Sequence, residues 1–254
     1  MTDIGGGTVD LYGGRGQEYP QTRPMEKCMT ELNGPRTGPA AEGAPQQLIV
    51  LCHGLGADGH DLIDIAAAWT RAVPHAAFAA PDAPFPCDIA PMGRQWFSVA
   101  DRTPALMEQG VRRAAGFLSD FIYAELARLS LPPDAYALMG FSQGAMTCLF
   151  TGLRRPVPPR AILAYSGALI APESLAADRR AAGAMGPVPV LIVHGEDDDV
   201  VPVTRSRDAE ANLIAAGIPV ESLYCPRLGH GIDEAGLSVG ALFLQRAFAA
   251  KLVG

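Results

Sequence analysis

Ser142 is the residue whose type and setting most clearly indicate chemistry. It is the centre of a Gly-Phe-Ser-Gln-Gly pentapeptide at 140–144, a G-x-S-x-G pattern between an apolar segment, 135–139, and a helix-like segment, 143–154. A serine on such a strand-to-helix turn is a candidate nucleophile, because the turn exposes its hydroxyl above a sheet. The flanking glycines suit the turn, since side chains there would crowd the strand and the helix. An ordinary loop serine is the alternative, because short patterns of small residues also arise by chance in a Gly-rich chain.

A serine hydroxyl needs a histidine to take its proton, and that histidine needs a carboxylate to orient it. After a serine on this kind of turn, the chain order is acid and then histidine. Two histidines follow Ser142, and only His230 also follows the carboxylates of 196–199, since His194 precedes them. We therefore expect His230 to be the base, with a capping histidine in a Gly-rich turn as the alternative. The spacing leaves open which member of 196–199 is the acid; the others would be solvated or would cap the next helix.

An oxyanion hole requires two backbone N–H groups, one after the nucleophile and one from a loop after an early strand. Gln143 is expected to supply the first. The loop 53–59, with the sequence His-Gly-Leu-Gly-Ala-Asp-Gly, follows an apolar strand, and Leu55 is the candidate for the second. A nucleotide-binding loop is the alternative reading, but the full spacing of a dinucleotide fingerprint is missing.

Short apolar runs alternate with longer helix-like runs from residue 47 onward, which predicts a mostly parallel sheet with helices on both faces. We expect strands at 47–52, 76–80, 135–139, 160–165, 188–194 and 220–224. We expect helices at 61–73, 106–130, 143–154, 204–216 and 236–252. The segments 53–59, 196–199 and 228–231 each follow a strand, so they should meet at the carboxyl edge of the sheet, where ligands bind.

The first 45 residues are rich in Gly, Pro and charge and have little apolar periodicity. We interpret residues 1–45 as a flexible N-terminal arm and residues 46–254 as one α/β domain. Because Met29 opens a plausible native start, we also hypothesise that residues 1–28 are an upstream extension without a role.

The charge, cysteine content and histidine spacing of the sequence exclude several kinds of partner. The net charge of −7 includes no long basic run, which argues against a nucleic-acid partner. Five cysteines without a C-x-x-C pair are typical of a reduced, cytoplasmic protein. The absence of a secretory signal pattern and of a long apolar run argues against stable membrane anchoring. The five histidines show no spacing typical of metal ligands, so we expect no metal site.

These motifs together resemble the phospholipase/carboxylesterase family, which includes the acyl-protein thioesterases. The matching segments are 53–59, 95–97, 140–144, 194–202 and 229–230, in the family's order. The resemblance implies an α/β-hydrolase core with a minimal cap or none, a cytosolic location and no cofactor. It also places the acid on Asp198 and the oxyanion hole on Leu55 and Gln143.

The family's Trp-Phe segment lies beside the acyl pocket, and here it is Trp96 and Phe97. The resemblance implies that Met92, Trp96 and Phe97 form an apolar wall for the substrate, with ordinary core packing as the alternative for each. An exposed apolar mouth at this site could also serve a homodimer interface.

Three functions follow, in order of preference. The first is hydrolysis of carboxylic esters with short to medium acyl chains by Ser142, His230 and Asp198. The second is thioesterase or lysophospholipase action on long acyl chains. The third is a non-catalytic binding protein on a hydrolase scaffold.

Overall fold

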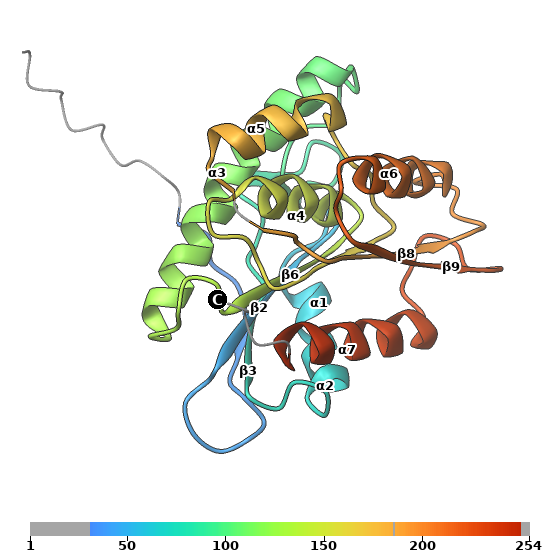
Figure 1. The fold of residues 1–254 in the computed structure, drawn as a ribbon. Helices are drawn as coiled ribbons and strands as arrows, with labels where there is room; N and C mark the ends of the chain where they lie inside the picture. The colour runs from blue at the N-terminus through green and yellow to red at the C-terminus, as the bar shows by residue number, and fades with distance from the viewer. Residues whose placement is uncertain (1–30, 185, 250–254) are drawn as a thin grey trace, which may run out of the picture.

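The structure, a computed structural model, describes residues 31–184 and 186–249. Its centre is a seven-stranded sheet with the strand order β1-β3-β2-β6-β7-β8-β9, in which every neighbouring pair except β1 and β3 is parallel (Figure 1). The strands are β1 (Arg36–Thr37), β2 (Gln47–Cys52), β3 (Ala76–Ala79), β6 (Tyr136–Phe141), β7 (Ile162–Tyr165), β8 (Val190–Gly195) and β9 (Val220–Cys225). Two short strands, β4 (Phe85–Pro86) and β5 (Arg94–Gln95), form a separate antiparallel pair.

Helices cover both faces of the sheet, as predicted (Figure 1). One face carries α3 (Pro104–Arg128), α4 (Gln143–Arg154), α5 (Leu175–Ala181) and α6 (Thr204–Ala215). The other face carries α1 (His60–Ile63), α2 (Ile65–Trp69) and α7 (Glu234–Ala249). A short 3₁₀ turn, η1 (Pro172–Ser174), leads into α5. In the described part of the chain, no helix is long and apolar enough to cross a membrane.

The core alternates residue by residue along the central strands. On β2, Leu48 and Val50 face the helix layer of α3 and α4, whereas Ile49 and Leu51 face the layer of α2 and α7. All four are fully buried. A strand covered on both faces needs apolar residues at every position, which explains the continuous apolar runs in the sequence.

The six predicted strands are all present, within a few residues of their expected bounds. The helix predicted at 61–73 is two short helices, α1 and α2, that meet at Asp64. The sequence analysis missed α5, β1 and the β4–β5 pair, because each is short and contributes few apolar residues.

The end of the predicted flexible arm is packed against the sheet. Arg36 and Thr37 pair with β3, and Leu32 is buried. The guanidinium of Arg36 also donates two hydrogen bonds, of 2.9 and 2.7 Å, to the carboxylate of Glu125 on α3. Residues 32–37, which the prediction assigned to the arm, therefore contact the domain. The hypothesis about residues 1–28 lies outside the described residues.

Candidate active site

Ser142 lies on a sharp turn between β6 and α4, where the sequence placed it. Its backbone angles are φ 54° and ψ −117°, in a region that non-glycine residues rarely adopt. The turn is held by a 2.8 Å hydrogen bond from the Ser142 N–H to the carbonyl of Tyr165, at the end of β7. Such strain at the first turn of a helix is characteristic of functional sites, because the surrounding structure must impose it.

The two motif glycines are required by close backbone contacts. A Cβ atom at Gly144 would lie 1.9 Å from the carbonyl oxygen of Cys52, on β2. A Cβ atom at Gly140 would lie 2.4 Å from the backbone of Gly144. Side chains at either position would force β2, β6 and α4 apart, so the sequence pattern reflects the packing of the turn.

His230 and Asp198 are hydrogen bonded to each other. The distance from His230 Nδ1 to Asp198 Oδ2 is 2.7 Å, and the other carboxylate oxygen accepts the N–H groups of Val200 (2.9 Å) and Val201 (2.8 Å). Burial acts to raise the pKa of Asp198, but the hydrogen bonds from His230, Val201 and Val200 outweigh it and lower that pKa. An ionised Asp198 fixes the proton of His230 on Nδ1 and leaves Nε2 as a proton acceptor.

The structure distinguishes Asp198 from its acidic neighbours. Asp198 is buried against His230, whereas Glu196, Asp197 and Asp199 are exposed. Glu196 pairs with Arg207 instead. Of the run 196–199, Asp198 is therefore the carboxylate that contacts the histidine.

The histidine lies beside the serine turn. The ring of His230 packs against the ring of Phe141, the residue before Ser142, with 4.8 Å between the ring centroids. Ser142, Asp198 and His230 follow β6, β8 and β9, so the structure brings all three to the carboxyl edge of the sheet.

The loop after β2 reaches the same place. A Cβ atom at Gly54 would lie 3.4 Å from the Cβ of Ser142, so this part of the loop runs over the serine. The next residue is Leu55, and Gln143 begins α4. Within the described residues, the N–H groups of Leu55 and Gln143 donate no hydrogen bond to the protein; that they form an oxyanion hole stays a prediction.

His53 holds this loop in place, a role that the sequence analysis missed. Its Nε2 accepts the N–H of Ala83 at 2.9 Å, which leaves the proton on Nδ1 to donate to the carbonyl of Gly54 at 2.7 Å. Its own carbonyl accepts the indole N–H of Trp96 at 3.0 Å. Burial lowers the pKa of His53, in keeping with a neutral ring.

Gln143 has a second role through its side chain. The carboxamide accepts the N–H of Trp96 at 2.8 Å and donates to the carbonyl of Phe97 at 2.7 Å. It therefore joins the nucleophile helix to the Trp-Phe segment.

Trp96 and Phe97 do not form the apolar wall that the resemblance implied. Their side chains are 0% and 1% exposed, and both belong to the core beneath α3 and α4. A side chain without exposed surface cannot touch a substrate unless the fold opens, so both residues support the site from below.

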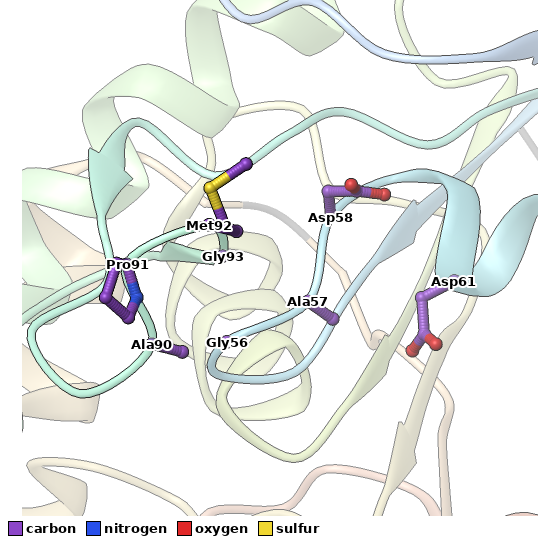
Figure 2. Close-up of a pocket in the computed structure, with 8 residues that line it drawn as sticks. All are labelled: Gly56, Ala57, Asp58, Asp61, Ala90, Pro91, Met92 and Gly93. Carbon is purple, nitrogen blue, oxygen red and sulfur yellow. The ribbon is translucent and has the colours of Figure 1, made fainter.

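Met92 lies at a pocket beside the loop that follows β2 (Figure 2). The pocket has a volume of about 420 Å³, and Met92 is 96% exposed at its edge. The lining residues are Gly56, Ala57, Asp58, Asp61, Ala90, Pro91, Met92 and Gly93. The loop 56–58 is joined to β5, which directly follows the loop 90–93, by a 2.9 Å hydrogen bond from the Gly56 N–H to the carbonyl of Arg94. That Met92 binds substrate remains a prediction.

In the part of the chain that the structure describes, no group of three or more His, Cys, Asp or Glu side chains is arranged to hold a metal ion. The four described cysteines, at 52, 87, 148 and 225, are buried free thiols.

Comparison with known proteins matches the chain to hydrolases. The sequence profile described as Phospholipase/Carboxylesterase matches residues 39–247. Acyl-protein thioesterase 1 of Schizosaccharomyces pombe is 30% identical over 213 residues, which is 81% of this chain and 91% of the relative. A probable inactive carboxylesterase of Oryza sativa subsp. japonica is 28% identical over 77% of this chain and 82% of the relative. The crystal structure of esterase PE8 superposes with a TM-score of 0.79 and 38% identity, over 86% of this chain and 100% of that one.

Proposed function

Because the chain belongs to the phospholipase/carboxylesterase family and is an ester or thioester hydrolase, we propose that it hydrolyses carboxylic esters with short to medium acyl chains. In this proposal Ser142 is the nucleophile, His230 the base and Asp198 the acid. The observation that carries it is the hydrogen bond between Asp198 and His230 beside the strained serine turn.

The geometry supports acyl transfer to water in two steps. His230 Nε2 accepts the Ser142 proton as the hydroxyl oxygen attacks the ester carbonyl, while the N–H groups of Leu55 and Gln143 stabilise the oxyanion. His230 then protonates the leaving alcohol, and an acyl-enzyme remains. A water molecule, deprotonated by His230, attacks this intermediate and releases the carboxylic acid and free Ser142. Asp198 remains ionised throughout and stabilises the positive form of His230.

The pocket supports a preference for short to medium acyl chains. Its lining combines small apolar side chains with two carboxylates, Asp58 and Asp61. Each methylene that a site buries contributes about 0.8 kcal/mol. Trp96 and Phe97 are buried in the core and add no exposed apolar surface to this lining, so we expect the gain to level off after a few carbons.

A second candidate is thioesterase or lysophospholipase action on long acyl chains. The similarity to the S. pombe acyl-protein thioesterase favours it. So does the exposure of Ile89 and Met92, which are 73% and 96% exposed and could cover part of a long chain outside the pocket. A third candidate, a non-catalytic binding protein, is raised by the similarity to the inactive rice relative.

The substrate series that separates these candidates is a set of p-nitrophenyl esters with acyl chains of two to sixteen carbons. Ser142→Ala is the test variant, and Ser222→Ala is a control that removes a β9 hydroxyl that donates to Glu210 on α6. We expect turnover that peaks at short to medium chains, is abolished by Ser142→Ala and is kept by Ser222→Ala. A rise toward the longest chains would favour the second candidate, and no turnover at any length would favour the third.

We also propose a cytoplasmic location, which the free thiols of the described cysteines support. A homodimer through the exposed apolar surface near Met92 remains a prediction, to be checked by sedimentation.

A further inference from the structure

His194 is a buried histidine that the proposed mechanism does not use. It lies near the end of β8, and its side chain has no exposed surface. Its Nε2 is 2.8 Å from the carbonyl oxygen of Val201 and 3.1 Å from Asp198 Oδ2. Its Nδ1 is 2.7 Å from the hydroxyl oxygen of Ser206, which is also buried.

The proton on the His194 ring can be assigned from these partners. Both partners of Nε2 are acceptors, a carbonyl and an ionised carboxylate, so Nε2 carries the proton. Burial lowers the pKa of His194 and favours the neutral ring, in which Nδ1 is then an acceptor. The Ser206 hydroxyl therefore donates its one proton to Nδ1 at 2.7 Å. The Gly167 carbonyl oxygen, at 3.1 Å from the same hydroxyl, is the more distant acceptor.

This arrangement surrounds the turn that presents Asp198. The N–H of Val201 donates to Asp198 Oδ1, and the carbonyl of Val201 accepts from His194. The same imidazole N–H also faces Asp198 Oδ2, the oxygen that His230 binds. His194 thus restrains both the backbone of the turn and the carboxylate.

The support extends to the nucleophile through the end of β7. The carbonyl of Gly167 approaches Ser206, and the carbonyl of Tyr165 accepts the N–H of Ser142. A Cβ atom at Gly167 would lie 2.6 Å from the Cβ of Ala145, on the nucleophile helix. The 165–167 segment therefore contacts both the serine turn and the group that holds the acid.

We propose that His194 and Ser206 are positioning residues that hold Asp198 in the orientation in which it binds His230. The inference rests on the proposed function, because it assigns a role to residues behind the acid. An apolar residue at 194 would leave Val201 and Asp198 without this donor, so the carboxylate could rotate away from His230. Misplacement of this kind typically lowers turnover about a hundredfold.

The test is a double-mutant cycle with His194→Leu and Asp198→Asn, assayed on the best p-nitrophenyl ester. We expect His194→Leu to lower kcat about 10-fold to 100-fold with little change in KM, and to have almost no further effect when Asp198 is already Asn. His194→Gln should recover most of the loss, because its carboxamide can place an N–H near the position of Nε2. An equal loss in both backgrounds would show a merely structural role and overturn the proposal, as would full activity of His194→Leu.

A readout without turnover separates this inference from the proposed function. The His230 Nδ1 proton, hydrogen bonded to Asp198, can be followed by proton NMR. We expect its resonance to be lost in His194→Leu and kept in His194→Gln, whether or not the esters are substrates. If His194→Leu does not fold, Ser206→Ala takes its place in both experiments, with a smaller expected loss. An unchanged His230 proton in the folded His194→Leu or Ser206→Ala variant would overturn the proposal.

Discussion

The two halves of the site are held by different forces. Around Ser142, backbone packs directly on backbone: Gly144 fits against the carbonyl of Cys52, and Gly140 fits against the backbone of Gly144. Around His230, side-chain hydrogen bonds do the same work: Asp198 accepts from His230 and from the turn that follows it. The serine turn has no room for an added atom at Gly140 or Gly144. The contact between His230 and Asp198 depends instead on which ring nitrogen carries the proton.

This difference determines how each half should respond to substitution. A change at the packed glycines of the nucleophile half acts through volume and should alter folding and activity together. A change in the acid–base half acts through hydrogen bonds, so an isosteric variant can keep the fold and lose the chemistry. Four measurements test this difference.

The largest expected effect is that of Asp198→Asn. The amide keeps the size of the side chain but does not stabilise the positive form of His230, and it favours the wrong histidine tautomer. We expect kcat to fall about ten-thousand-fold, with the fold retained. The matched control is Asp197→Asn, whose side chain is exposed. If the control is the damaging change in ester assays, the acid is misassigned.

Gly144→Ala should have the next largest effect, and on stability. The new methyl group would overlap the Cys52 carbonyl, which cannot move without shifting β2. We expect the free energy of unfolding to fall by about 3 kcal/mol or more, as measured by urea denaturation. Gly116→Ala is the control, because no atom lies within 4 Å of its added Cβ on α3. That variant should gain about 0.5–1 kcal/mol; equal losses in the two would refute the packing argument.

Acidification should act on both halves, through His53 and His194. Burial lowers the pKa of each, so the unfolded chain binds their protons at a higher pH than the folded chain does. Their stabilising contribution is therefore complete above the unfolded pKa of about 6.5 and is lost as the pH falls toward the folded values. We expect a slope of at most about 1.4 kcal/mol per pH unit for each histidine. Urea denaturation at a series of pH values measures this slope. An unchanged slope in His194→Gln would show that His194 does not contribute to the pH dependence.

The smallest effect is expected at the edge of the pocket, at a residue that belongs to neither half of the site. Met92→Ser removes an apolar side chain that is 96% exposed, so a bound ester loses only partial contact. We expect KM for the longest ester turned over to rise about twofold to fivefold, with kcat unchanged. Ile89→Ser is the control, since this exposed residue does not line the pocket. A similar rise in both variants would indicate that a long chain lies outside the pocket.

The sequence predicted the central fold because its signal is local. An apolar strand such as β2 and a well-patterned helix such as α4 are recognisable from adjacent residues alone. By contrast, β1 has two polar residues, and its pairing with β3 depends on contacts more than forty positions away. The seven-residue α5 buries only Leu175, so its pattern is too weak to read.

The candidate site shows the same limit. Spacing was sufficient to select Ser142 and His230, and the resemblance selected Asp198. The roles of His53 and His194 depend on partners from other elements, Ala83 and Ser206. The burial of Trp96 could not be predicted from the sequence either. An aromatic residue that lines a pocket and one that packs in the core behind it have the same local sequence pattern.

The attachment of β1 bears on how molecules of this protein meet one another. Arg36 and Thr37 pair with the outer edge of β3, and Arg36 also donates hydrogen bonds to Glu125 on α3. A strand edge without such a cover offers free N–H and C=O groups to any passing chain. Proteolysis just after Thr37 would remove β1 and expose that edge, so such a product should self-associate at high concentration.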